Sequence, residues 1–168
     1  MVDVLIRAPR AGDGEGLARS WLDAGAYYAH LNPDLFQIPQ ADGLAQSFEE
    51  WLLSMPSEDA YALVAEKDRQ VVGFITAAVE RPVENAAGQL LRDLGRVRVV
   101  IHALVVQEAH RRQGIGTRLM EAVEERARSR GAVIALVDTY IESPLSVPFY
   151  EQRMGYSRRA LRFRKELM

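Results

Sequence analysis

The stretch VVIHALVVQEAHRRQGIGTRLMEAVEERARSR, residues 99–130, decides the fold of this chain. Its first eight residues are apolar except for His102 and rich in β-branched side chains, which predicts a buried strand. A polar, basic turn follows, and Gly114 and Gly116 lie where a long amphipathic helix begins. Apolar residues recur along that helix every four residues, and Gly131 ends it. The stretch therefore predicts a strand, a glycine-containing turn and a helix in direct succession.

The glycine-containing turn has the properties of a phosphate-binding loop. Glycine lets the backbone approach a ligand closely, and the N–H groups of a first helical turn attract anions. Arg111 and Arg112 add positive charge beside it. A Walker loop is excluded because no lysine follows the glycines, and a dinucleotide fingerprint is excluded because Leu119 replaces its third glycine. The residues favour a phosphate or pyrophosphate cradle; the alternative is a glycine-capped turn before an ordinary core helix.

Length and composition limit the classes of protein that fit this chain. Its 168 residues are expected to form one domain, residues 1–168, and 48% apolar residues suffice for a full core. The net charge of -2 gives no basic excess, so we expect no nucleic-acid partner. The absence of cysteine excludes disulfides and a cysteine nucleophile. We expect a cytoplasmic protein with no membrane partner, because neither a signal peptide nor a spanning apolar run is present.

Strands and helices are predicted in the order β-α-α-β-β-β-α-β-α-β, which makes the class α/β or α+β with a mixed sheet. Residues 28–42 are expected to be irregular, and residues 89–94 to be either a helical turn or an extended edge. The predicted strands cover residues 2–8, 60–66, 70–78, 99–106, 133–137 and 158–165, and the predicted helices cover residues 15–27, 44–55, 115–130 and 144–153.

Two motifs resemble those of one family. Arg111, Gly114 and Gly116 form Arg-x-x-Gly-x-Gly, which resembles the acyl-CoA signature of the GNAT family of N-acetyltransferases. The stretch FYEQRMGY, residues 149–156, resembles the C-terminal signature of the same family and lies at the expected distance from the first motif. The resemblance implies a GNAT-like mixed, mostly antiparallel central sheet flanked by helices. It also implies acetyl-CoA as co-substrate and no metal.

The resemblance also implies where the co-substrate would bind. Ser143 stands where the family often has an asparagine that contacts the pantetheine arm, and serine has a shorter reach. Backbone groups freed at a bulge in the central strand would hold the pantetheine and the acetyl carbonyl, and the following turn would hold the pyrophosphate. The residues concerned are Leu104, Val105 and Val106 in the strand, and Arg111, Arg112, Gln113, Gly114, Ile115, Gly116 and Thr117 in the turn and helix.

Catalysis would then be direct transfer without a covalent enzyme intermediate. Tyr150 is the candidate acid for the leaving thiolate, and the alternative is that it only packs under the sulfur. His102 is the candidate base, since no glutamate lies between Gly95 and Val106; the alternative is a hydrogen-bonded core histidine.

The acceptor side of the site is less defined by the sequence. In the resembled family the segment between the first two helices helps form the acceptor site, which makes Tyr28 and His30 candidates. The alternative is a loop that only covers the core. We expect an N-acetyltransferase that acts on a primary amine of an unidentified small molecule or peptide. A non-catalytic acyl-CoA-binding or sensing module is the alternative, and family members are frequently dimers, which leaves a homodimer open.

Overall fold

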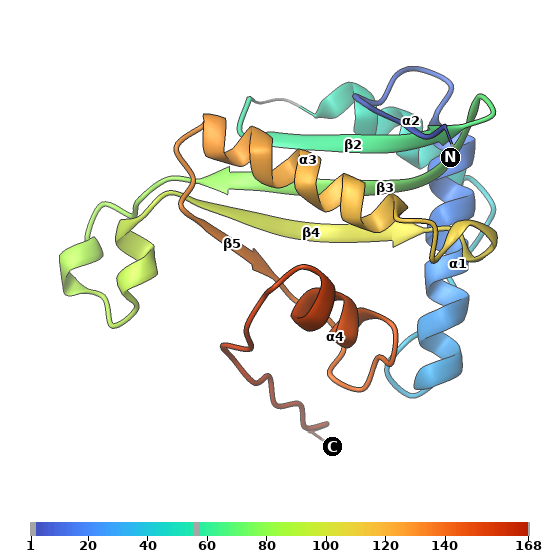
Figure 1. Ribbon diagram of the computed structural model, residues 1–168. Coiled ribbons are helices and arrows are strands. Elements are labelled where there is room, and N and C mark those ends of the chain that lie inside the picture. Colours follow the sequence, from blue (N-terminus) through green and yellow to red (C-terminus); the bar gives the residue numbers. More distant parts are fainter. Residues whose placement is uncertain (1–2, 56–57, 168) are drawn as a thin grey trace. The chain divides into compact units, whose positions relative to one another are not determined.

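The computed structural model describes residues 3–55 and 58–167. The chain divides into two compact units, Met1–Asp138 and Thr139–Met168 (Figure 1). The expectation of one domain over residues 1–168 stays a prediction. Within the described residues, no helix is both long and apolar enough to cross a membrane.

The first unit is built on a five-stranded sheet in the order β1-β2-β3-β4-β5. Neighbouring strands are antiparallel from β1 to β4, and β5 joins β4 in parallel. The predicted class, a mixed and mostly antiparallel sheet with flanking helices, is confirmed. The strands are β1 (Leu5–Arg7), β2 (Ala60–Lys67), β3 (Gln70–Glu80), β4 (Arg98–Val106) and β5 (Ile134–Val137).

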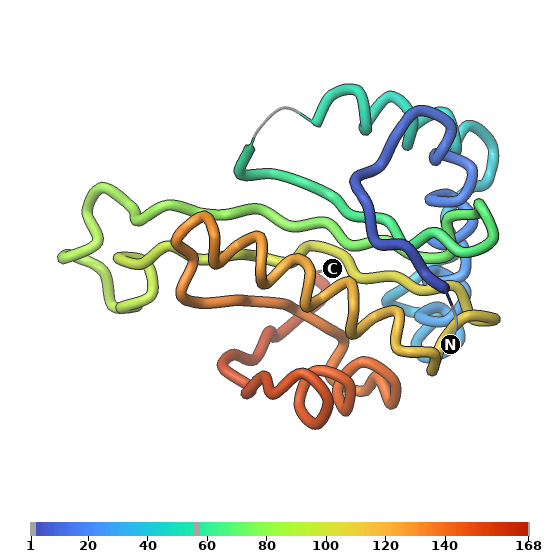
Figure 2. The backbone as a smooth tube through the Cα atoms, turned by 45° about the horizontal axis from the view of Figure 1, so that its top comes forward, coloured from blue at the N-terminus to red at the C-terminus, as the bar shows by residue number. Residues whose placement is uncertain are grey.

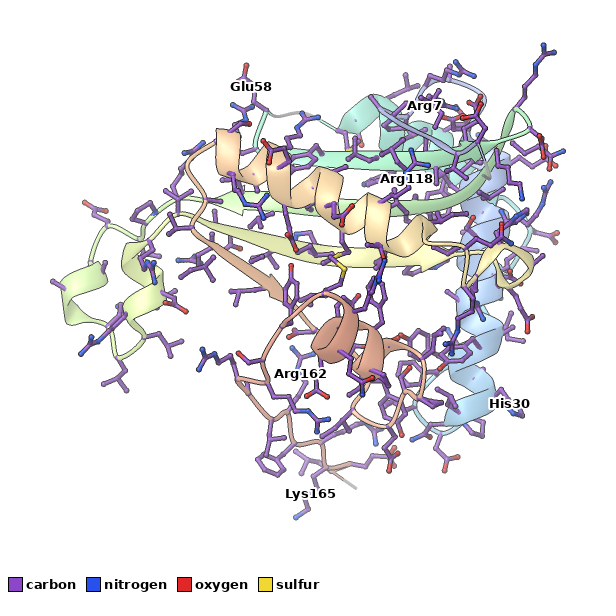
Figure 3. All side chains as sticks on the ribbon, in the orientation of Figure 1. Arg7, His30, Glu58, Arg118, Arg162 and Lys165 are labelled. Carbon is purple, nitrogen blue, oxygen red and sulfur yellow. The ribbon has the colours of Figure 1, made fainter. Side chains whose placement is uncertain are left out.

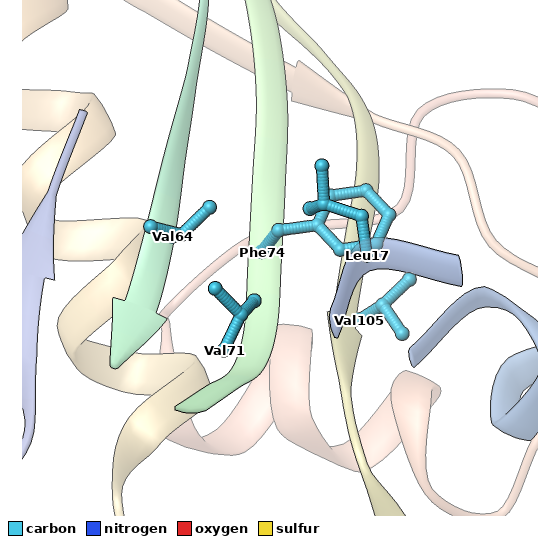
Figure 4. Close-up of a cluster of buried hydrophobic side chains, with 5 residues drawn as sticks. All are labelled: Leu17, Val64, Val71, Phe74 and Val105. Atoms are coloured by element: carbon cyan, nitrogen blue, oxygen red, sulfur yellow. The ribbon is translucent and has the colours of Figure 1, made fainter. Parts of the chain in front are cut away.

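Helices cover both faces of this sheet. The helices of the first unit are α1 (Gly14–Leu31), α2 (Leu44–Ser54) and α3 (Ile115–Ser129). A buried cluster combines one side chain of α1 with side chains of β2, β3 and β4 (Figure 4). Further apolar side chains of α1 and α2 pack against this cluster. Tyr61, on the opposite face of β2 from Val64, donates its hydroxyl to the Val123 carbonyl oxygen of α3 at 3.2 Å. Figure 1 accordingly shows α3 across the other face of the sheet. The cluster consists of Leu17, Val64, Val71, Phe74 and Val105.

The first helix is longer than predicted. It runs to Leu31, so Tyr28 and His30 lie in its last turns and not in an irregular segment. The helix ends because Asn32 precedes Pro33, and proline disfavours a helical conformation in the residue before it. Asn32 accordingly has extended angles, φ -152° and ψ 90°. Position 2 of the first predicted strand lies outside the described residues.

The connection between β3 and β4 contains two short 3₁₀ turns, η1 (Ala86–Gly88) and η2 (Arg92–Gly95). The second overlaps residues 89–94, which the sequence predicted to be either a helical turn or an extended edge. The structure forms a helical turn there. Figure 2 shows this connection extending away from the sheet.

The second unit holds the short helix α4 (Ser146–Pro148) followed by one π-type turn, η4 (Phe149–Arg153). The predicted helix over residues 144–153 is thus formed in its later part. The predicted strand over residues 158–165 is wrong, because these residues adopt no regular secondary structure. Alternating side chains define two faces, but a strand forms only when a neighbouring strand accepts and donates its backbone hydrogen bonds.

Candidate functional site

A β-bulge interrupts β4 at the candidate base. Ala77 of β3 pairs with Ile101, and the preceding residue, Thr76, pairs with Ala103, which leaves His102 as the extra residue. His102 is exposed, so the alternative of a buried core histidine is wrong. The bulge was expected from the resemblance. Because a bulge interrupts the alternation of side chains, the two-residue spacing of His102 and Leu104 does not place them on one face of β4.

Beyond the bulge, β4 is paired along one edge only within the described ladder. Leu104, Val105 and Val106 face Ile75, Phe74 and Gly73 of β3. The parallel pairing with β5, however, ends at Ile101 and Val137. Because a central strand carries backbone groups toward both neighbours, this arrangement leaves the second edge of residues 104–106 outside the sheet ladder. The Val106 carbonyl oxygen accepts a hydrogen bond from Arg111 Nε at 3.0 Å.

The turn after β4 ends in an open helix N-terminus. A 3₁₀ turn, η3 (Glu108–His110), leads through Arg112, whose φ is 63°, to Gly114 at the N-cap of α3. Gly114 has φ 78°, and a Cβ built on it would meet no atom within 4 Å. Since glycine offers no capping side chain, the first N–H groups of α3 receive no cap from this residue. The local geometry fits close approach of an anion.

Arg111 is the fixed arginine of this turn. It is half-buried, its Nε–H is bonded to Val106, and its guanidinium carbon lies 5.2 Å from the centre of the Tyr27 ring. No hydrogen bond or ion pair engages its Nη1 or Nη2 within residues 3–55 and 58–167. These N–H donors remain for a ligand oxygen. Arg112, by contrast, is exposed.

Helix α1 anchors the start of the turn. Gln107 is 8% exposed; its backbone N–H donates to Val72, and its Nε2 donates to Val71 O at 2.9 Å and Ser20 Oγ at 3.0 Å. Asp23, one turn further along α1, accepts from the Glu108 N–H at 2.7 Å. These contacts were not predicted from the sequence. The available signal was the placement of Ser20, Asp23 and Tyr27 at positions i, i+3 and i+7, which share one helix face.

The same turn contains a buried polar atom without a protein partner. His110 Nδ1 is inaccessible and makes no hydrogen bond within the described part of the chain. An unsatisfied buried nitrogen is costly and is commonly explained by a bound group or water. Because His110 Nδ1 is covered by protein atoms, the turn's compatibility with a phosphate-bearing ligand rests on the open Gly114 and the remaining donors of Arg111.

Two predicted residues belong to the second unit. Ser143 is 1% exposed, and its Oγ accepts from the Ser146 N–H at 3.0 Å at the start of α4. Tyr150 is half-buried in η4, with its ring centre 5.2 Å from that of Phe149 and 6.0 Å from that of Tyr156. Single π-type turns occur frequently at functional sites.

The two predicted acceptor-side residues differ in their surroundings. The Tyr28 ring packs on Phe36, with centres 5.0 Å apart, and on Tyr27 at 5.1 Å. His30 is exposed at the C-terminal end of α1, as Figure 3 shows. The structure thus brings Tyr28, but not His30, into a cluster of side chains.

Fold and turn together define an α/β architecture in which the strand β4 leads into a helix whose N-cap, Gly114, provides no side-chain cap. The model of the acetyltransferase (GNAT) family matches residues 25–156. The chain belongs to this family of acetyltransferases.

Solved structures with the same fold agree. A transcriptional regulator from Bacillus halodurans C-125 is 22% identical, with a TM-score of 0.74, over 98% of this chain and 100% of the other. The aminoglycoside N-acetyltransferase AAC(6')-Iy in complex with CoA is 19% identical, with a TM-score of 0.64, over 99% of this chain and 97% of the other. Glucosamine-6-phosphate N-acetyltransferase from Arabidopsis thaliana is 15% identical, with a TM-score of 0.65, over 99% of both chains.

Proposed function

We propose that this chain is an acetyl-CoA-dependent N-acetyltransferase that moves the acetyl group directly to a primary amine of a small molecule or peptide. The observation that carries the proposal is the N-terminus of α3. There Gly114, on which a Cβ would meet no atom within 4 Å, lies three residues after an arginine with unused donors. This combination suits a pyrophosphate, the anionic group that links the pantetheine arm of CoA to its nucleotide.

Two of the structural neighbours named above support an amine acceptor. Their names describe acetyl transfer to an aminoglycoside and to glucosamine-6-phosphate. The first is also a complex with CoA. At this level of identity the likeness concerns the fold, so the acceptor of this chain is left at the level of a primary amine.

The proposal assigns binding roles to the first unit. Residues 111–117 hold the pyrophosphate, with Arg111 supplying the N–H donors that the protein does not use. The edge of β4 over residues 104–106, which β5 does not pair, holds the pantetheine amides and the acetyl carbonyl. Ser143 remains a predicted pantetheine contact, and Tyr28 and His30 remain predicted acceptor contacts.

The proposal assigns the proton transfers to two side chains. Acetyl-CoA supplies a thioester carbonyl and a thiolate leaving group. The amine nitrogen forms a bond to the carbonyl carbon while the carbon–sulfur bond breaks and sulfur takes the bonding pair. His102, exposed at the bulge of β4, takes the proton that the amine loses. The Tyr150 hydroxyl donates a proton to the thiolate, whose basicity is similar to that of a phenol.

The test measures thiol release from acetyl-CoA with a panel of primary amines, using the wild type and Tyr150→Phe. The variant keeps the ring contacts with Phe149 and Tyr156 and loses only the hydroxyl. We expect kcat to fall about a hundredfold, within the range for a lost general acid, while acetyl-CoA affinity is unchanged. Tyr140→Phe, which removes a hydroxyl bonded to Glu142 in the same unit, is the matched control and should keep full activity.

The panel also separates the two functions that the sequence left open. Release of thiol only when an amine is present supports the transferase. Tight binding of acetyl-CoA without turnover on any amine would refute it and favour an acyl-CoA-binding or sensing module. Unchanged kcat in Tyr150→Phe would remove the acid role alone.

A further inference from the structure

Four side chains form a continuous row from the phosphate-binding turn to the loop between α1 and α2. The guanidinium of Arg111 lies 5.2 Å from the centre of the Tyr27 ring. Tyr27 meets the Tyr28 ring edge-on at 5.1 Å, and Tyr28 meets Phe36 at 5.0 Å. Phe36 belongs to the loop of residues 32–43, and its backbone N–H is bonded to Asn32 O at 3.0 Å.

This row connects parts of the chain that are distant in sequence. Tyr27 and Tyr28 are adjacent on α1, yet one faces the turn after β4 and the other faces the loop that follows α1. Aromatic pairs and cation–π pairs depend on ring orientation, so a displaced ring weakens the contacts on both of its sides. A displacement of the Phe36 ring would therefore change the orientation of Tyr28 and Tyr27 and weaken the contact of Tyr27 with the Arg111 guanidinium.

We propose that Tyr27 is a positioning residue that holds Arg111 for the pyrophosphate, and that the row Arg111–Tyr27–Tyr28–Phe36 couples the loop of residues 32–43 to acetyl-CoA binding. The inference rests on the proposed function, because it takes the anion at Arg111 to be CoA. It goes beyond that function because it makes the affinity for acetyl-CoA depend on the loop of residues 32–43, which acts on Arg111 through Tyr28 and Tyr27.

The rigid connection between α1 and the turn favours such coupling. The bonds from Gln107 to Ser20 and from Glu108 to Asp23 fix the start of the turn to α1, two turns and one turn before Tyr27, respectively. The backbone on both sides of the Arg111–Tyr27 contact is therefore held. Changes in the loop reach the arginine through side-chain orientation, and not through movement of the whole helix.

Coupling of this kind is reciprocal. If an amine binds at Tyr28, as proposed above, its binding orders the row and raises the affinity of the protein for acetyl-CoA. Bound acetyl-CoA then raises the affinity for the amine by the same factor. The same row thus provides a physical route by which the two substrates favour each other before the transfer.

The experiment measures acetyl-CoA binding by calorimetry for the wild type and a set of variants. We expect Tyr27→Leu to weaken binding about three- to tenfold, the range for a lost cation–π contact at a half-buried site. Tyr27→Phe keeps the ring and should stay within about twofold of the wild type. Phe36→Leu, which leaves Arg111 and Tyr27 themselves unchanged, should weaken binding about two- to threefold.

Two further variants distinguish positioning from general damage to the fold. Trp21→Leu removes another aromatic ring from α1, one that packs on Phe74 with centres 6.2 Å apart and is not part of the row. It should lower stability and leave acetyl-CoA affinity unchanged. In an Arg111→Ala background, Tyr27→Leu should have no further effect on affinity, because a positioning residue acts only through the group it positions.

The outcomes are distinct. A wild type that does not bind acetyl-CoA refutes the proposed function, and this inference with it. A wild type that binds, with unchanged affinity in Tyr27→Leu or with additive losses in the double variant, refutes this inference alone. A loss in Phe36→Leu that persists in the Arg111→Ala background would refute the coupling through the row.

Discussion

Two glycines at opposite ends of α3 provide a matched test of the phosphate site. Gly114 precedes the helix with φ 78°, and Gly131 follows it with φ 86°. A Cβ at either position would meet no atom within 4 Å. Alanine is therefore strained at both sites by the left-handed backbone and hindered at neither by a neighbour.

The structure sets the expected size of both effects. A left-handed conformation costs a residue with a side chain about 1–2 kcal/mol, so Gly114→Ala and Gly131→Ala should lose similar unfolding free energy. For a chain of this size each kcal/mol lowers Tm by about 2–4 °C. Only position 114 lies at the N-terminus of α3, where the pyrophosphate is proposed to bind, and loss of charge-assisted hydrogen bonds there weakens binding about ten- to hundredfold.

The assays are thermal unfolding and calorimetry with acetyl-CoA on both variants. We expect equal losses of stability and a loss of affinity confined to Gly114→Ala. Gly114→Glu, which places a carboxylate beside the pyrophosphate, should abolish binding, whereas Gly131→Glu should retain it. Near-normal affinity in Gly114→Glu, or equal affinity of the two alanine variants, would refute the assignment of the phosphate site to this turn.

Two further predictions concern single polar side chains. Burial raises the pKa of Asp13, but hydrogen bonds from Arg7 and from the Arg10 N–H outweigh it and hold the pKa below its ordinary value of 3.8. The stabilisation by Asp13 is therefore present above about pH 4 and lost as pH falls through the lowered pKa. Asp13→Asn should lower the unfolding free energy by about 1–3 kcal/mol at pH 7 and flatten its decline in acid; parallel pH profiles in urea titrations would contradict this. Ser143→Ala should cost about 1 kcal/mol in the same titrations, because the Ser146 N–H loses its capping acceptor, and a value near zero would count against the cap.

The central unit of the fold could be read from the sequence because its information is local. The period of apolar residues in α3, the β-branched run of β4 and the glycine at the turn all lie within residues 99–130, and each is formed as predicted. The family resemblance rested on Arg111, Gly114 and Gly116 in this stretch and on a second local motif, residues 149–156. The matched family segment, residues 25–156, confirms it.

Other features depended on partners that the sequence does not name. The predicted end of the first helix, at residue 27, is four residues too early, because α1 continues to Leu31 and ends only at Asn32, the residue before Pro33. The strand over residues 158–165 has the right alternation but no pairing partner, and is not formed. The side chains that surround a segment decide such cases, and periodicity describes only the segment itself.

The sequence by itself determined the class of protein, the strand, turn and helix at its centre, and the chemical character of the turn, because residue type and spacing carry that information. Only the tertiary structure decided that His102 is the extra residue of a bulge, since a bulge exists relative to the register of β3. It alone decided that α1 holds the turn, through Ser20 and Gln107, which are 87 residues apart in the chain. Contacts across such distances are set by how helices pack on a sheet, which no local pattern in the sequence specifies.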